Sequence, residues 1–102
     1  MEVYFQNRHL EKLYTTGWDK KYPLEDHVID SFFEVVAIIQ AAKNIYDFRN
    51  QPSLKFERMI STEKFYSFRL NRKFRLEVTI DWENKEKTIG IVGIEEISVH
   101  CR

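Results

Sequence analysis

Residues 64–76, KFYSFRLNRKFRL, have the pattern of a tight β-hairpin, and the length of the turn decides which side chains share a face. Directly opposed residues of an antiparallel pair point to the same side of a sheet, and a shift of one residue sends every side chain to the other side. A two-residue turn would oppose Phe68 to Arg75 and mix the two faces. A three-residue turn at 71–73 makes one face wholly apolar and is therefore predicted, with the pairs Leu70–Phe74, Phe68–Leu76 and Tyr66–Val78.

The same register sets two arginines against each other on the opposite face. Arg69 lies directly opposite Arg75, and Ser67 lies opposite Glu77. Like charges in directly opposed positions destabilise a sheet, so a group of opposite charge is expected beside them. Two candidates are open. The first is a carboxylate of the chain, either Glu77 on the diagonal or Glu57 on a neighbouring strand, and the second is an anionic ligand such as a phosphate.

The length and composition of the chain fit one folded domain over residues 1–102. With 43% hydrophobic and 15% aromatic residues the chain is too apolar for intrinsic disorder. Its longest apolar run, 35–39, is far too short to span a bilayer, and its single cysteine cannot form an internal disulfide. No basic leader followed by a long apolar stretch opens the sequence. We therefore expect a cytoplasmic protein with no membrane partner.

The charge of the chain is balanced in total but uneven along the sequence. A net charge of zero argues against a general nucleic-acid binder. Residues 53–76, however, contain seven Lys and Arg against two Glu, a local charge of +5, and the rest of the chain carries −5. Such a dipole allows one basic surface to face a polyanion.

Hydrophobic periodicity predicts two helices in the first half of the chain. The stretch EVYF fits a short strand, and a helix over 8–16 follows, with Asn7 as N-cap and Gly17 at its end. A longer helix is expected from after Pro23 to about Lys43, where apolar residues recur at i, i+3 and i+4. The connector NIYDFRNQP, which follows, has room for a helical turn.

From residue 54 onward the pattern becomes strand-like, and the resulting order is β-α-α-β-β-β-β. This order predicts an α+β fold in which two N-terminal helices pack on one face of a largely antiparallel sheet of four or five strands. The three glycines form no phosphate-binding motif, and no His, Cys or carboxylate spacing resembles a metal site, so we expect no cofactor and no metal. The predicted strands are 54–59, 65–70, 74–82 and 87–99.

The hairpin sequence resembles the RelE/ParE superfamily of toxins and, within it, the HigB-like branch called plasmid-maintenance killer proteins. The resemblance is carried by Tyr-Ser-x-Arg-Leu-Asn from Tyr66, by the step Phe74-Arg75-Leu76 and by His100 near the end, and it covers nearly the whole chain. It implies a RelE-like fold and the role of toxin in a type II toxin–antitoxin pair. Many such toxins enter the ribosomal A site and cut mRNA there with a 2′-hydroxyl as nucleophile. The implied partners are therefore the ribosome, mRNA and a HigA-like helix-turn-helix antitoxin.

The resemblance also implies which side chains act on RNA. Cleavage of this kind needs a base for the 2′-hydroxyl, cations for the charge that builds on the phosphoryl oxygens, and an acid for the leaving 5′-oxygen. The residues that match such sites are Arg69, Arg75 and His100, and guanidinium groups suit the phosphate because they bind its oxygens in pairs. The expected RNA-binding residues are Lys55 and Arg58 on the preceding strand, with Arg72 and Lys73 in the turn.

The chain departs from these relatives in ways that leave the general base and acid unassigned. Related toxins usually have KGD or a similar sequence with a following glycine between the second and third strands. Residues 60–64 of this chain, ISTEK, have no glycine, and a common lysine of that stretch is missing. Ser67 stands where the RelE type has lysine, and Cys101 stands where HigB-like relatives often have tyrosine. Two other functions stay open: a gyrase-inhibiting toxin without nuclease chemistry, as in the ParE branch, and a decayed toxin that only binds its antitoxin. The local basic charge favours the nuclease.

Overall fold

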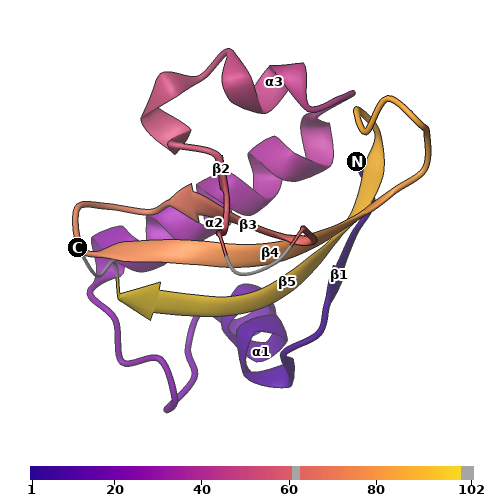
Figure 1. Ribbon diagram of the computed structural model, residues 1–102. Coiled ribbons are helices and arrows are strands. Elements are labelled where there is room, and N and C mark those ends of the chain that lie inside the picture. The colour runs from indigo at the N-terminus through magenta and orange to yellow at the C-terminus, as the bar shows by residue number, and fades with distance from the viewer. Residues whose placement is uncertain (61–62, 100–102) are drawn as a thin grey trace.

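The computed structural model describes residues 1–60 and 63–99, which form three α-helices, one 3₁₀ helix and five strands. No helix among these residues is both long enough and apolar enough to cross a membrane. In chain order the elements are β1 (Val3–Phe5), α1 (Arg8–Thr16), α2 (Asp26–Ala41), α3 (Tyr46–Arg49), the 3₁₀ helix η1 (Pro52–Leu54), β2 (Glu57–Arg58), β3 (Phe65–Arg69), β4 (Phe74–Trp82) and β5 (Gly90–Val99) (Figure 1).

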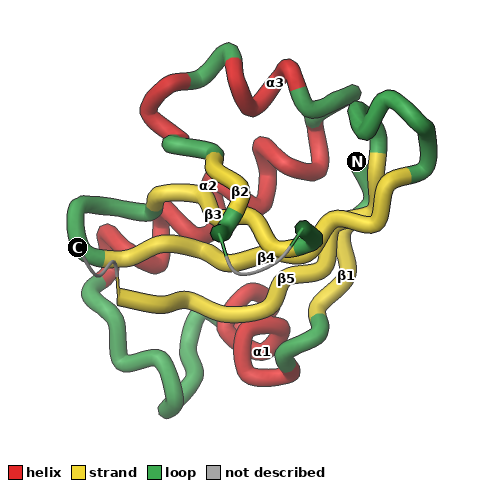
Figure 2. The backbone as a smooth tube through the Cα atoms, viewed as in Figure 1, coloured by secondary structure: helices red, strands yellow, loops and turns green. Residues whose placement is uncertain are grey.

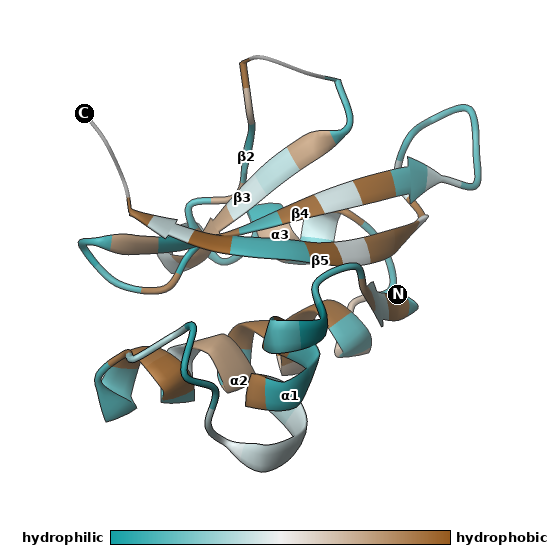
Figure 3. Ribbon diagram, turned by 90° about the horizontal axis from the view of Figure 1, so that it is seen from below, coloured by the Kyte–Doolittle hydropathy of each residue, from teal (hydrophilic) through white to brown (hydrophobic). Residues whose placement is uncertain are grey.

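The five strands form one sheet in the order β1-β5-β4-β3-β2. The pair β1–β5 is parallel and the other three pairs are antiparallel. The long strands β4 and β5 run side by side through the middle of the sheet (Figure 2). Helices α1 and α2 lie together on one face, which we call the inner face, and the opposite side of the sheet is the outer face (Figure 3). The predicted α+β fold is confirmed.

The predicted register of the β3–β4 hairpin is also confirmed. The backbone N–H of Leu70 donates to the carbonyl of Phe74 at 2.9 Å, which closes a three-residue turn. The side-chain oxygen of Asn71 accepts from the backbone N–H of Lys73 at 2.9 Å and of Phe74 at 2.7 Å. The turn is therefore held by a side chain that bonds its own backbone, as asparagine does in many turns. The resulting pairs include Tyr66–Val78, Ser67–Glu77, Phe68–Leu76 and Arg69–Arg75.

The inner face of the hairpin forms the core with the main helix. Phe68, Leu76 and Val78 are all fully buried, as are Phe32 and Val36 of α2. Burial of a side chain of this size stabilises a fold by about 1.5–3 kcal/mol. The apolar half of the hairpin pattern is therefore used entirely for packing, and only the outer face is free for other roles.

Strand β2 is much shorter than the strand predicted over 54–59. The 3₁₀ helix η1 begins at Pro52, whose fixed φ suits the first turn of a helix. Lys55 then adopts a left-handed backbone with φ +47°, which ends the helix and cannot continue as a strand. Only Glu57 and Arg58 pair with β3. The expected helical turn in the preceding connector is present as α3.

Both ends of α1 are as predicted, whereas α2 is shorter at both ends. The side chain of Asn7 accepts from the backbone N–H groups of His9 and Leu10, and Gly17 ends α1 with φ +82°. Helix α2 stops at Ala41 because Ala42 is extended. The N-terminal ammonium group donates to three carbonyls at this end, those of Ile39, Gln40 and Ala42.

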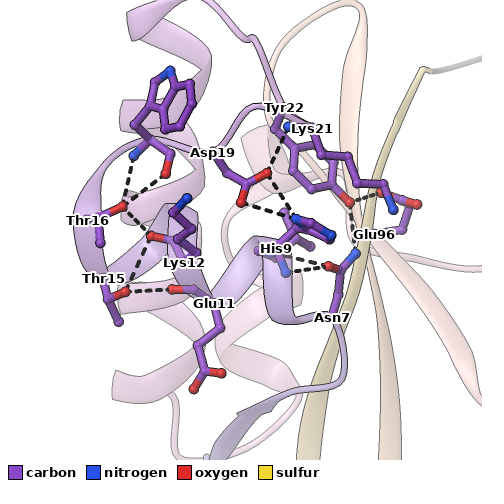
Figure 4. A network of polar contacts seen from close by, with 12 residues as sticks. Asn7, His9, Glu11, Lys12, Thr15, Thr16, Asp19, Lys21, Tyr22 and Glu96 are labelled. Carbon is purple, nitrogen blue, oxygen red and sulfur yellow. Dashed lines mark hydrogen bonds and ion pairs between the residues drawn. The ribbon is translucent and has the colours of Figure 1, made fainter.

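A polar network ties the loop after α1 to the helix and to β5 (Figure 4). The amide nitrogen of Asn7 donates to the Tyr22 hydroxyl at 2.8 Å, and that hydroxyl donates to the carboxylate of Glu96. Burial and this carboxylate raise the pKa of Tyr22. Burial alone would also raise the pKa of Asp19, but hydrogen bonds from the backbone of Lys21 and from His9 outweigh it and lower that pKa. The network fixes the loop with every member paired.

The Asn7→Ala variant is expected to lose about 1–3 kcal/mol of unfolding free energy. Alanine removes the cap of α1 and also the bonds that the amide makes to the Tyr22 hydroxyl and to the Glu95 carbonyl. Urea denaturation monitored by circular dichroism measures the change. The exposed Asn50→Ala, as a matched control, should change stability by less than about 0.5 kcal/mol. Equal stability of the two variants would show that the network does not stabilise the fold.

Candidate functional site

The outer face carries the two opposed arginines at the hairpin end of the sheet. Arg69 of β3 is opposite Arg75 of β4, and Ser98 of β5 continues the row. Both arginines are half-buried. The ion pairs made by residues 1–60 and 63–99 are His9–Asp19, His27–Glu25 and Lys64–Asp81, so neither arginine has an ion-pair partner among the described residues.

The next row of the outer face is acidic. Glu57 of β2 is opposite Ser67, Ser67 is opposite Glu77, and Glu77 is opposite Glu96 of β5. Glu57 and Glu77 lie close to Arg69 and Arg75 in the register, but they form no ion pair with them. The carboxylate of Glu96 instead accepts from the Tyr22 hydroxyl. The hypothesis that Glu77 or Glu57 pairs with the arginines is therefore wrong. The outer face is basic at the hairpin end and acidic in the adjacent row, so the local +5 does not make a uniformly basic face.

A cavity of about 380 Å³ opens at the boundary between these two rows. We call it the Arg75 cavity. It brings together two of the predicted site residues, Arg58 and Arg75, with the carboxylate-bearing Glu57 and with Ser67. Met59 and Ile60 also line it, and Ile60 is fully exposed. Arg58 is opposite Tyr66 of the inner face in the register, so the groups on the outer-face side of the cavity are the guanidinium group of Arg75, one carboxylate and one hydroxyl. These are the groups needed to hold a phosphate and to accept a proton beside it.

Ser67 is the least expected member of this cavity. Its side chain is 1% exposed, and its hydroxyl has no hydrogen-bond partner within the described part of the chain. An unpaired buried hydroxyl costs about 1–3 kcal/mol, so such a group calls for an explanation. A hydrogen bond to a bound ligand would supply the missing partner.

The remaining predicted residues lie elsewhere. Arg69, although opposite Arg75, lines a different cavity of about 180 Å³ beside α2 and η1. Lys55 lines a third cavity across β2. Arg72 and Lys73 are exposed in the turn, with the Lys73 ammonium 5.3 Å from the ring centre of Phe74. Residues His100 and Cys101 lie outside the described residues.

Sequence reasoning did not identify Glu57 as a site residue. It appeared only as a counter-ion, because its position depends on the pairing of a two-residue edge strand. Its register opposite Ser67 follows from η1 and Lys55, which the strand pattern alone did not reveal. Residues 1–60 and 63–99 contain no group of three or more His, Cys, Asp or Glu arranged to hold a metal ion.

Comparison with known proteins agrees with this architecture. A family model for HigB-like toxins, described as the RelE-like toxin of the type II toxin–antitoxin system HigB, matches residues 3–89. The fold is similar to that of a YoeB/ParE toxin from Agrobacterium tumefaciens, with a TM-score of 0.56 and 8% identity over 99% of this chain and 100% of that one. At this identity the likeness concerns the fold alone. No curated protein matches the sequence.

The Ser67→Ala variant is expected to be up to about 1 kcal/mol more stable than the wild type. Alanine fills nearly the same space and removes a buried hydroxyl that has no partner. Chemical denaturation of both proteins measures the difference, with Ser98→Ala of the same face as the control. A loss of more than about 1 kcal/mol in Ser67→Ala would mean that the hydroxyl is satisfied within the folded chain.

Proposed function

We propose that this chain, which belongs to the HigB-like family of type II toxin–antitoxin toxins, is an endoribonuclease that cuts mRNA on the ribosome. As a toxin of such a pair it has an antitoxin as partner. The observation that carries the proposal is the guanidinium group of Arg75, which has no ion-pair partner among residues 1–60 and 63–99 and shares one cavity with a carboxylate and a buried hydroxyl.

The cavity supports a mechanism in which Arg75 stabilises the reacting phosphate. Its guanidinium group donates two hydrogen bonds to phosphoryl oxygens, and these bonds strengthen as negative charge builds in the transition state. The Ser67 hydroxyl donates to a third oxygen or to the attacking group. Arg58, which lies on the edge strand opposite Tyr66, adds positive charge near the cavity. A phosphate also relieves the repulsion between Arg75 and Arg69.

Glu57 is the proposed general base. Its carboxylate lines the Arg75 cavity and accepts the proton of the 2′-hydroxyl as that oxygen attacks phosphorus. The bond from phosphorus to the 5′-oxygen then breaks, which leaves a 2′,3′-cyclic phosphate on one fragment and a 5′-hydroxyl on the other. The leaving oxygen takes a proton from a general acid, for which His100 remains the prediction.

The other cations are proposed to hold the RNA around the cut. Arg69 raises the positive potential beside the phosphate, and Arg72 and Lys73 meet backbone phosphates from the exposed turn. Contacts of this kind weaken as salt rises, because binding releases counterions. The proposed antitoxin is a HigA-like helix-turn-helix protein that prevents RNA from reaching the Arg75 cavity.

Expression of the chain without its antitoxin is expected to arrest growth and to create new 5′ ends within coding regions of mRNA, since a catalytic toxin acts at low copy number. Primer extension on RNA from induced cells detects these ends. Intact transcripts together with broken DNA would replace the proposal with the gyrase-inhibiting alternative. Normal growth would point to a decayed toxin that only binds its antitoxin.

The Arg75→Ala variant should cleave mRNA roughly 10²-fold more slowly or worse, by analogy with the loss of one oxyanion donor. Binding should persist, because the lost interaction matters most in the transition state. Stability should stay within about 1 kcal/mol, since Arg75 makes no ion pair with the described residues and faces a like charge. Cleavage is measured on ribosomes programmed with one mRNA.

The control for Arg75→Ala is Arg72→Ala, which removes an arginine from the turn of the same hairpin and should slow cleavage much less. Equal activity of Arg75→Ala and the wild type would rule out Arg75 as the phosphate clamp. Loss of activity together with unfolding would mean that Arg75 supports the fold and not the chemistry.

A further inference from the structure

A second cavity adjoins the Arg75 cavity across the edge strand β2. It has a volume of about 280 Å³, and its lining includes Phe48 and Arg49 of α3, together with Lys55 and Phe56. We call it the Phe56 cavity. Glu57 lines both cavities, so they meet at this residue. Its lining residues come from the stretch of chain that runs from α3 to β2 (Figure 1).

The Phe56 cavity is built around a stack of aromatic rings. Phe56 and Tyr66 are parallel to within 5°, with ring centres 5.3 Å apart. The ring centres of Phe48 and Phe68 lie 5.1 Å and 5.0 Å from that of Phe56. Phe56 is half-buried, whereas Phe48 and Phe68 are buried in the core. The half-buried ring of Phe56 is therefore held in place by the buried rings of the core.

A planar cation lies at this ring. The guanidinium carbon of Arg49 is 5.7 Å from the centre of Phe56, within the distance at which a cation is attracted to an aromatic face. Arg49 is exposed and makes no ion pair with the described residues. Both aromatic rings and guanidinium planes are surfaces on which proteins stack the bases of single-stranded RNA.

A second cation, Lys55, lines the same cavity. Lys55 is exposed, has no ion-pair partner among the described residues, and holds a left-handed backbone with φ +47°. For a residue other than glycine this conformation costs about 1–2 kcal/mol. The structure therefore keeps a lysine in an unfavourable conformation next to an aromatic ring and an arginine. A stacking surface with adjacent cations is the composition of a nucleotide site.

We propose that the Phe56 cavity is a second RNA subsite, which holds the nucleotide next to the one cut in the Arg75 cavity. Its base stacks against Arg49 and Phe56, and its phosphate pairs with Lys55. The inference rests on the proposed RNA-cleaving function and adds to it a base-stacking position, because no aromatic side chain among the described residues lines the Arg75 cavity. An acidic peptide would use the two cations but not the aromatic surface, so single-stranded RNA fits better.

The test measures RNA binding in the absence of cleavage. The parent protein is the full chain carrying Arg75→Ala. It is titrated into a short fluorescent single-stranded RNA at one fixed salt concentration, and fluorescence anisotropy gives the dissociation constant. Adding Arg49→Ala should weaken binding about tenfold, as expected for the loss of one stacked base. Arg49→Lys keeps the charge but not the plane, and should stay about fivefold weaker than the parent. The control Arg8→Ala, an exposed arginine of α1, should bind within about twofold of the parent.

A second arm needs no substitution in the cavity. The parent protein is titrated with RNAs in which one nucleotide at a time lacks its base. One position should weaken binding about tenfold, and the same RNA should bind the Arg49→Ala protein no more weakly than intact RNA does. Absence of measurable RNA binding, or equal effects at all positions, overturns the proposal. So does full recovery by Arg49→Lys, which would assign the effect to charge alone.

Two further results separate this inference from the function on which it rests. In the first, RNA binding depends on Arg49 and on one nucleotide position, but the wild-type protein cuts no mRNA on ribosomes. This result would rule out the proposed nuclease and support the subsite. In the second, the wild-type protein cleaves mRNA normally, but Arg49→Ala and Arg8→Ala bind RNA equally well. This result would rule out the subsite and leave the proposed nuclease standing. If Arg49→Ala weakens only binding of the purified antitoxin, the cavity belongs to a protein partner and the proposal fails.

Discussion

The register of the β3–β4 hairpin is the constraint on which both the core and the candidate site depend. The three-residue turn, held by the side chain of Asn71, sends the paired side chains of Phe68 and Leu76 to the inner face. Because side chains alternate along a strand, the same turn must send Arg69 and Arg75 to the outer face. A shift of one residue would bury the arginines and expose the phenylalanine. The register that packs the core therefore also sets positions 69 and 75 opposite each other on the outer face.

Several locally unfavourable features gather at the two cavities beside this pair. Within the described residues, the two arginines oppose each other without an ion-paired carboxylate, and the hydroxyl of Ser67 is buried without a hydrogen-bond partner. Lys55, at the Phe56 cavity, has a left-handed backbone. Each costs free energy that the fold must offset elsewhere, mainly by the aromatic and aliphatic core. Costs that concentrate at one place are typical of functional sites. A phosphate in the Arg75 cavity and a nucleotide in the Phe56 cavity would satisfy these groups together.

Local chemistry explains which features were predictable from the sequence. The hairpin register, the Asn7 cap and the Gly17 end of α1 depend on neighbouring residues, and all are confirmed. The short β2 and the separate cavity of Arg69 depend on how η1, α2 and α3 pack, which no periodicity encodes. For the same reason Glu57 was interpreted as a counter-ion, although the structure has it in the Arg75 cavity. The arginine pair was found because it is part of the register.

The central claim is that Arg75 meets a phosphate of bound RNA, and the side-chain resonances of the arginines test it most directly. The protein, labelled with nitrogen-15, is titrated with a single-stranded RNA that carries 2′-O-methyl groups and therefore cannot be cut. The account predicts that the Nε–Hε signal of Arg75, assigned with Arg75→Lys, shifts and saturates as the RNA binds, while that of Arg8 does not move. RNA binding that shifts other signals and leaves Arg75 unchanged would contradict the account.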